Sequence, residues 1–146
     1  MKIISRRARP YDITLYNYIS TVNGVASYQR TLVKRVSLDL AYQQRLSQRG
    51  VTTSNEVSMM IDLRDIETTS NRTFLIYDAW NSITDKTAYF TFNTKYDFFV
   101  VGEATETLPE ETKTDMLKKY RGYSITSVGI PASNSGTPII IQVTGK

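Results

Sequence analysis

Hydrophobic and polar positions alternate with a period of two along most of this chain, a pattern typical of strands with one buried face. Residues 11–40 form the clearest example, two alternating runs joined by Asn23-Gly24. This dipeptide supplies the two positive φ angles of a tight type I′ turn, so the sequence predicts a β-hairpin. The expected inward positions are Ile13, Leu15 and Ile19 on the first strand and Val36, Leu38 and Leu40 on the second.

Further strands are expected in the rest of the chain. Residues 57–65 and 87–92 alternate like half-buried strands, and residues 97–103 form a continuous apolar run, as in a strand covered on both faces. The segments 123–130 and 137–143 flank the turn-rich PASNSG and predict a second hairpin. The expected inward positions are Val57, Met59, Ile61, Leu63, Ala88, Phe90, Phe92, Ile139, Ile141 and Val143.

Two stretches lack this alternation. Residues 41–55 are polar, Gln-rich and basic, and Gly50 with the following Thr-Thr-Ser-Asn run predicts a long loop. Residues 66–86 are apolar without a clean period, and we expect them to cover one end of a barrel or sandwich with Trp80 as an anchor.

One helix is predicted, near the C-terminus. Thr107 and Glu110 match a capping box, and Gly122 is placed to end the helix. The apolar stripe is narrow and comprises Met116, Leu117 and Tyr120. Such a helix is expected to cover a sheet edge or a barrel end.

The expected fold is therefore mainly antiparallel β, a small barrel or sandwich with one short helix. At 146 residues the chain is interpreted as one domain, 1–146, with a basic N-terminal arm (1–10) and the long loop (41–55).

The chain contains no Cys and no His, which removes disulfides, thiolates, His-based acid–base catalysis and zinc sites built on these residues. No apolar run approaches the ~20 residues of a membrane span, and the first residues do not match a secretory signal. These features fit a reducing cytoplasm and predict no membrane partner.

Charged residues are unevenly distributed along the chain. Residues 1–49 carry nine Lys or Arg against two Asp, a net charge of +7, and the remainder carries nine against twelve, a net charge of −3. Nucleic acid nearby, a basic face meeting an acidic neighbour, and an uneven solvated surface all fit this pattern.

The sequence contains few candidate catalytic or metal-binding residues. Asp62 and Asp65 are three apart on a strand and point to opposite faces, so an Asp62–Arg64 surface ion pair is the expected arrangement. Glu103 and Glu106 precede the predicted helix, whose start they can stabilise. We expect neither an enzyme nor a metal site, and no cofactor.

Tyrosines and arginines indicate possible nucleic-acid contacts. Tyr16, Tyr18 and Tyr28 near Arg30 could form a stacking face for single strands, or could stabilise the hairpin as cross-strand pairs. The arm carries Arg6, Arg7 and Arg9, whose forks suit phosphates or carboxylates, so it could dock on a neighbour, lie along DNA or stay disordered.

Four stretches resemble a family of small neck proteins of tailed phages of Gram-positive hosts, the head-completion or stopper proteins. They are DITLYNYI, YQRTLVKRV, YDFFVVGE, and MLKKYRGYSITSV with the closing GTPIIIQVTGK. The chain departs from the family in having MMIDLRD where relatives tend to carry Ile-Pro, and in lacking an aromatic residue in the last strand.

The resemblance implies a homo-oligomeric ring of β-barrels in the virion neck, assembled in the host cytoplasm. Its partners would be portal and adaptor proteins, tail terminator or tail tube proteins, and packaged double-stranded DNA. The loop 41–55 would then face the channel, with candidate residues Gln43, Gln44, Arg45, Gln48 and Arg49. Protein partners would meet Arg6, Arg7 and Arg9 of the arm and Glu111, Asp115 and Lys118 of the helix.

Other functions remain open. A tail-completion or tail-terminator protein shares this small β architecture. A single-strand nucleic-acid-binding barrel would depend on Tyr16 or Tyr28, and an enzyme would depend on Asp62 or Glu103.

Overall fold

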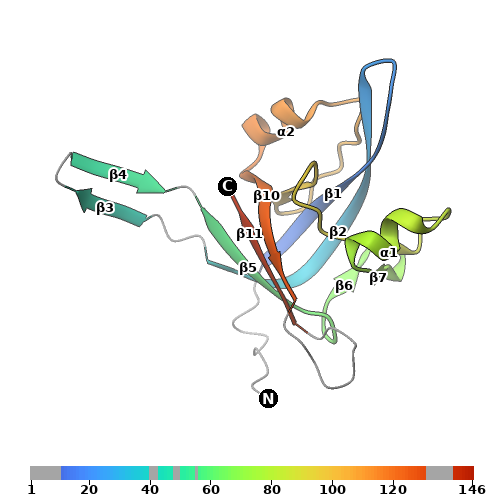
Figure 1. Ribbon diagram of the computed structural model, residues 1–146, viewed down its shortest axis with the longest axis horizontal. Helices are drawn as coiled ribbons and strands as arrows, with labels where there is room; N and C mark the ends of the chain where they lie inside the picture. The colour runs from blue at the N-terminus through green and yellow to red at the C-terminus, as the bar shows by residue number, and fades with distance from the viewer. Residues whose placement is uncertain (1–10, 40–42, 48–49, 55, 131–139) are drawn as a thin grey trace.

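The computed structural model describes residues 11–39, 43–47, 50–54, 56–130 and 140–146, with the backbone alone described for 43–47 and 50–54. Six strands close into an antiparallel β-barrel, as Figure 1 shows. Around the wall they are β1 (Tyr11–Val22), β9 (Phe98–Val101), β10 (Gly122–Gly129), β11 (Ile140–Gly145), β5 (Val57–Asp62) and β2 (Val25–Asp39). Pairing of β1 with β2 closes the ring. The prediction of a small antiparallel β-barrel is confirmed.

The β1–β2 hairpin forms where the sequence predicts it. Asn23 and Gly24 have φ angles of 53° and 76°, as a type I′ turn requires. Ile13 and Leu15 are buried, but the prediction for Ile19 was wrong, because its side chain is 41% exposed. The reason is geometric: β1 pairs with β9 only as far as Tyr16, and beyond that point the hairpin extends past the barrel.

Strand β2 connects the two halves of the wall. It pairs with β1 over most of its length and with β5 at Ser37–Asp39. Arg35, with a φ angle of +68°, lies just before this change of partner, opposite a register shift in β1. A local irregularity of this kind bends a strand and increases its twist, which helps a sheet close on itself.

The barrel interior is filled by side chains from all six strands. Val57, Met59 and Ile61 point inward as predicted, as do Ile141 and Val143, whereas the prediction for Ile139 lies outside the described residues. Each fully buried Val, Leu, Ile, Met or Phe side chain contributes roughly 1.5–3 kcal/mol of hydrophobic stabilisation. Within the described residues, the buried members of this interior cluster are Ile13, Leu15, Val33, Val36, Leu38, Val57, Met59, Ile61, Phe90, Phe92, Phe99, Tyr123, Ile125, Ile141 and Val143.

Strand β9 is covered on both faces, as its continuous apolar run predicts. Phe99 packs in the barrel interior, while Phe98 and Val100 pack outside it in a second cluster. That outer cluster, which also contains Tyr16, lies beneath the helix α2 (Lys113–Lys119). The helix therefore covers the outer wall of the barrel at β1 and β9.

The helix begins later than predicted. Thr107 does not cap it, because Thr112 is the N-cap residue and accepts a hydrogen bond from the Asp115 amide at 3.1 Å. Residues 107–111 instead form a separate turn in which the Glu111 amide donates to the Thr107 carbonyl at 3.0 Å. The sequence contains two possible capping boxes, Thr107 with Glu110 and Thr112 with Asp115, and the second one caps the helix. Gly122 was predicted to end the helix, but it begins β10.

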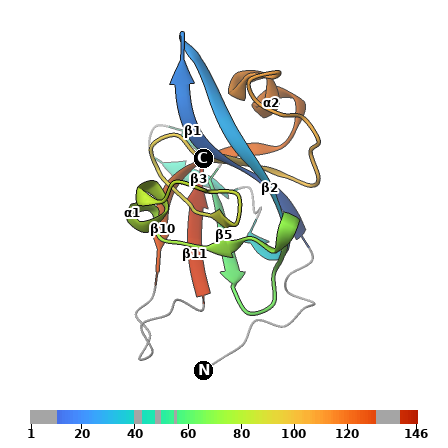
Figure 2. The same cartoon turned by 90° about the vertical axis from the view of Figure 1, so that its right-hand side faces the viewer.

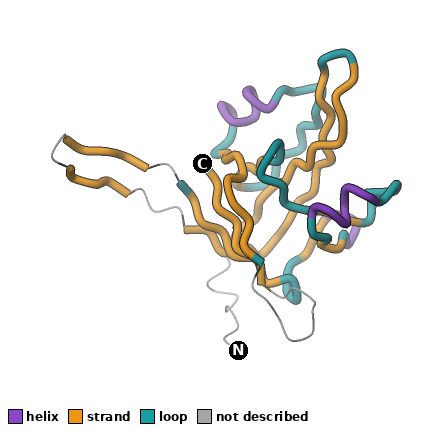
Figure 3. The backbone as a smooth tube through the Cα atoms, in the orientation of Figure 1, coloured by secondary structure: helices purple, strands orange, loops and turns teal. Residues whose placement is uncertain are grey.

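The prediction of a loop at 41–55 was wrong for most of that segment. Strands β3 (Gln43–Ser47) and β4 (Gly50–Ser54) form an antiparallel hairpin inserted between β2 and β5. Figures 1 and 3 show this hairpin, which we call the insertion hairpin, to one side of the barrel. Within the described residues it pairs with no other strand.

The segment between β5 and β9 covers part of the barrel with short elements, including a helix that the sequence did not reveal (Figure 2). Trp80 is buried, as expected of an anchor, and its ring lies 6.3 Å from that of Tyr77 and 5.0 Å from the Lys86 Nζ. The elements are β6 (Glu67–Thr68), the 3₁₀ turn η2 (Thr69–Asn71), β7 (Thr73–Phe74), α1 (Tyr77–Ser82) and β8 (Tyr89–Phe90). Of the helices in the described ranges, none has the length and apolar character needed to cross a bilayer.

Candidate interaction surfaces

The helix α2 is held against the barrel by apolar contacts. Met116 is fully buried, and Leu117 and Tyr120 pack against the outer cluster, so the predicted stripe is confirmed. Tyr16 lies at the centre of this cluster, stacked on Phe98 with 4.9 Å between ring centroids. Burial raises the pKa of the Tyr16 phenol to about 12.

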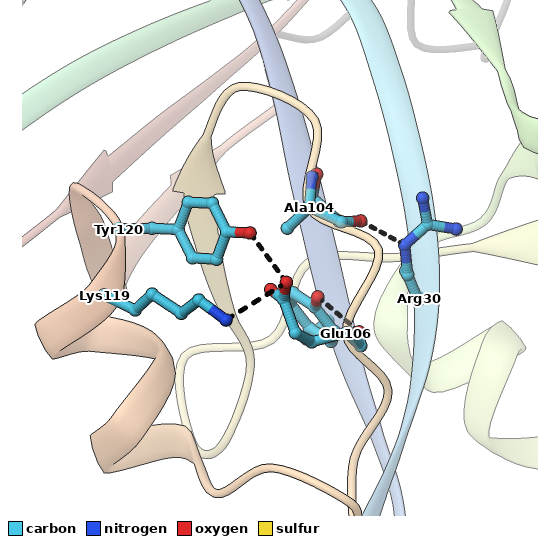
Figure 4. A network of polar contacts seen from close by, with 7 residues as sticks. Arg30, Ala104, Glu106, Lys119 and Tyr120 are labelled. Atoms are coloured by element: carbon cyan, nitrogen blue, oxygen red, sulfur yellow. Dashed lines mark hydrogen bonds and ion pairs between the residues drawn. The ribbon is translucent and has the colours of Figure 1, made fainter.

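Polar contacts around Glu106 fix the same helix (Figure 4). The Tyr120 hydroxyl donates to Glu106 Oε1 at 2.8 Å, and Lys119 Nζ lies 3.5 Å from the same oxygen. The hydrogen bond from Tyr120, aided by Lys119, holds the pKa of Glu106 below its usual value. From the barrel side, the Tyr16 hydroxyl donates to the Glu106 backbone carbonyl at 2.8 Å. Glu106 therefore links α2 to β1, a structural role that the sequence did not distinguish from helix capping.

The outward face of α2 carries the residues predicted to meet a partner. Asp115 and Lys118 are exposed and Glu111, just before the helix, is half-buried. Asp115 and Lys118 belong to α2 itself, whereas Glu111 belongs to the turn that precedes it.

The predicted channel residues lie in or beside the insertion hairpin. Gln43, Gln44 and Arg45 belong to β3, whereas Gln48 and Arg49 lie outside the described residues. Arg6, Arg7 and Arg9 of the N-terminal arm also lie outside them. The hairpin backbone places β3 and β4 in register, with Arg45 opposite Thr52.

The tyrosines do not form the stacking face that the sequence suggested. Tyr16 is buried, and Arg30 donates to the Ala104 carbonyl, as Figure 4 shows. Tyr18 and Tyr28 meet edge to face and are joined by Tyr96, whose ring centroid lies 4.5 Å from that of Tyr18. The pair stabilises the hairpin, as the alternative interpretation predicted.

Tyr96 adds an exposed aromatic surface. Its side chain is 42% exposed, and Lys95 Nζ lies 5.2 Å from its ring centroid. Nothing in the sequence connected Tyr96 to β1 and β2, because it comes from a loop before β9.

Asp97 forms a buried polar centre beside these aromatic side chains. Its carboxylate accepts hydrogen bonds from the Tyr18 amide at 2.8 Å, the Asn17 side chain at 2.8 Å and the Asn93 amide at 3.0 Å. Burial raises its pKa to about 6, although these donors and the charge of Lys113 oppose the shift. The centre ties β1 to the loop before β9.

The carboxylates considered for catalysis lie in different environments. Asp62 pairs with Arg64, with 3.1 Å between Oδ1 and Nε, but its side chain is buried, so the predicted ion pair is only half on the surface. Glu103 is exposed. In the described ranges, no three Asp or Glu side chains gather as a metal ion would require.

A pocket of about 440 Å³ opens beside β6 and β7. Its volume falls in the range typical of binding sites. Phe90 and Phe74 contribute apolar surface, and Arg64 and Arg72 contribute charge. Its lining residues are Leu63, Arg64, Ile66, Glu67, Thr68, Asn71, Arg72, Thr73, Phe74 and Phe90. This pocket could not be predicted from the sequence, because its walls come from several short elements.

Comparison with known proteins identifies a family without a described function. No curated protein and no solved structure matches the chain. A family of unknown function, DUF6751, matches residues 10–138, which is most of the barrel and everything inserted into it. The chain therefore belongs to the family of unknown function DUF6751.

Proposed function

We propose that the protein is a structural subunit of the neck of a tailed phage. In this proposal, copies form a ring between the portal–adaptor assembly and the tail, close the DNA channel and provide the surface to which the tail attaches. The resemblance of the four sequence stretches supports this role, and so does the closed barrel with its two protruding hairpins.

The observation that carries the proposal is the insertion hairpin. Within the described residues, β3 and β4 pair only with each other, and an isolated two-stranded hairpin is marginally stable in water. Such an element gains stability when other chains contact it, and a ring places several copies around one axis. There, Arg45 and Arg49 would face DNA phosphates, while Gln43, Gln44 and Gln48 would pair between copies.

Contacts that are weak between two subunits are sufficient to hold a ring together, because many copies engage at once. The outward face of α2 would contact a tail terminator, a tail tube protein or a neighbouring copy. The arginines of the N-terminal arm would contact an adaptor protein or DNA.

The first test is to silence the gene during phage infection, then examine the particles by electron microscopy and measure their DNA content. We expect emptied heads beside separate, finished tails. Filled heads with over-long or unfinished tails would instead assign the protein to tail completion. Normal virions would contradict both assignments.

The second test removes the insertion hairpin by replacing residues 43–54 with a short Gly-Ser linker. The barrel is expected to fold, because these strands make no pairs with it, while filled heads lose their DNA. Arg45→Gln serves as the milder variant, keeping the hairpin and removing one charge. Heads that stay sealed without the hairpin would show that it does not close the channel.

Single-strand nucleic-acid binding is the second candidate, favoured by the exposed Tyr96 beside Tyr18 and Lys95. It predicts binding to an oligonucleotide that weakens steeply with salt. Tyr96→Ala should then weaken binding about tenfold, since a stacked base contributes roughly 1–3 kcal/mol. Tyr77→Ala, which alters an exposed tyrosine on α1, is the matched control. Fluorescence anisotropy that shows no binding at low salt would exclude this candidate.

A further inference from the structure

We infer that the pocket beside β6 and β7 receives the turn Thr107–Glu111 of a second copy of this chain. The contact would repeat from copy to copy and join different surfaces of each subunit. This inference rests on the proposed function, because it names the contact by which subunits of the ring meet.

One of the positive charges that line the pocket, that of Arg72, has no ion-pair partner among the described residues. Two of the charged side chains that line it are paired, Arg64 with Asp62 and Glu67 with Arg35 at 2.9 Å. Arg72 differs, because every contact that the described residues make with it is to a neutral acceptor: the carbonyls of Arg30 and Thr87 and the Thr31 hydroxyl. No described carboxylate lies within ion-pair distance of Arg72.

The environment of Arg72 makes this charge costly. Burial and the neighbouring Arg30 both lower the pKa of Arg72, which means that the protonated form is destabilised where it lies. The same pocket is also lined by the apolar side chains of Leu63, Phe74 and Phe90. The chemistry that fits is a carboxylate next to an apolar group.

The turn Thr107–Glu111 offers this chemistry at the surface. Residues 103–111 contain four glutamates and no Lys or Arg. At the turn itself, Pro109 and Glu110 are exposed, whereas Leu108 is buried and anchors the turn to the outer cluster. The hydrogen bond from Thr107 Oγ1 to Glu110 Oε2, at 2.9 Å, and the backbone bond across the turn hold it in shape. A small apolar ring followed by a carboxylate thus projects on a preformed turn.

Among the described residues, no hydrogen bond or ion pair joins the turn Thr107–Glu111 to the side chains that line the pocket. A contact between two different surfaces generates a ring when the rotation between copies closes. Because the glutamates of the turn are negatively charged and Arg72 is positively charged, the turn of a second copy fits the pocket as its occupant.

The test measures self-association of the purified full chain by sedimentation velocity over a range of concentrations. Thr73→Glu places a carboxylate at the pocket rim, and Glu110→Lys reverses the charge of the turn; both positions are exposed. Each change alone should weaken self-association about tenfold or more, as expected for like charges brought together. The two changes together restore opposite charges across the contact and should recover most of the association.

Matched controls alter the same residue types elsewhere. Thr94→Glu changes an exposed threonine outside both surfaces, and Glu103→Lys reverses a charge outside the turn. Neither should shift association by more than about twofold. Recovery in the double variant also shows that each single variant folds, and circular dichroism provides a second check.

Three outcomes would overturn the inference: a wild-type chain that stays monomeric at every concentration, single variants that associate like the wild type, or a double variant that stays as weak as the single ones. The silencing experiment tests the neck function separately. Emptied heads together with any of these three outcomes would retain the neck role and reject this contact.

Discussion

Two buried aspartates in this barrel are stabilised in different ways. Asp62 lies beside the guanidinium of Arg64, which donates two hydrogen bonds to its carboxylate. Asp97 is equally buried but accepts from neutral donors, two backbone amides and the side chain of Asn17. Hydrogen bonds alone do not replace the lost hydration of the charge, so the pKa of Asp97 rises while a cation stabilises Asp62 directly.

Asp97 should make stability depend on pH between about 4 and 6. Because its folded pKa of about 6 lies above the ordinary value of 3.8, the folded state binds the proton more tightly, and the free energy of unfolding falls as the pH rises through this window. In Asp97→Asn this dependence is absent. Relative to the variant, the wild type should therefore lose about 2 kcal/mol of unfolding free energy from pH 4 to pH 6, as urea titrations followed by Trp80 fluorescence would measure. Parallel pH profiles of the two proteins would contradict the assignment.

Among the secondary-structure elements, the helix α2 is stable only because it packs against the barrel. A helix of seven residues has too few internal hydrogen bonds to persist alone in water. Met116 buries its whole side chain under the helix, and the Glu106 contacts hold the C-terminal end. The surface that α2 presents is thus positioned by the barrel beneath it.

Truncating the buried anchor should release this element. Met116→Ala is expected to lower the free energy of unfolding by about 2–5 kcal/mol, because it leaves a cavity in the outer cluster. Lys118→Ala, an exposed change on the same helix, should alter it by no more than about 0.5 kcal/mol. Thermal or urea unfolding of both variants measures the contrast, and equal effects would show that α2 is not docked through Met116.

Sequence patterns predicted those elements whose hydrophobic pattern extends over enough residues to be recognised. The strands containing Ile13, Met59 and Phe99 alternate or run apolar over four residues or more. The helix start was missed because Thr107 and Thr112 begin equivalent boxes, and only packing selects between them. Of the candidate surfaces, the outward face of α2 follows from helical spacing. The pocket and the Asp97 centre do not, since they bring together residues far apart in the chain.

The whole molecule combines a closed wall with a hairpin outside it. Every barrel strand has a paired neighbour on both sides, whereas β3 and β4 have one partner each in the described chain. Backbone hydrogen bonds in the wall therefore open only when the barrel is disrupted, while those of the insertion hairpin can open locally.

Native-state hydrogen exchange should show this division. Amides of β9 and β10 are expected to exchange through global unfolding, and those of Gln43–Ser47 and Gly50–Ser54 to exchange faster by at least about a hundredfold. Two-dimensional NMR of the isolated subunit measures both sets in one sample. Equal protection in the isolated subunit would mean that the hairpin is packed on the barrel, contrary to its pairing.

The order of strands around the wall also affects how the chain is made. β11 is the last of the six strands in sequence, yet it lies between β10 and β5 and pairs with both. Until the ribosome has released residues 140–145, a nascent chain holds an open sheet with two strand edges uncovered. Premature termination ahead of β11, or slow translation there, exposes these edges to other nascent chains, so the risk of aggregation is greatest before β11 has been made.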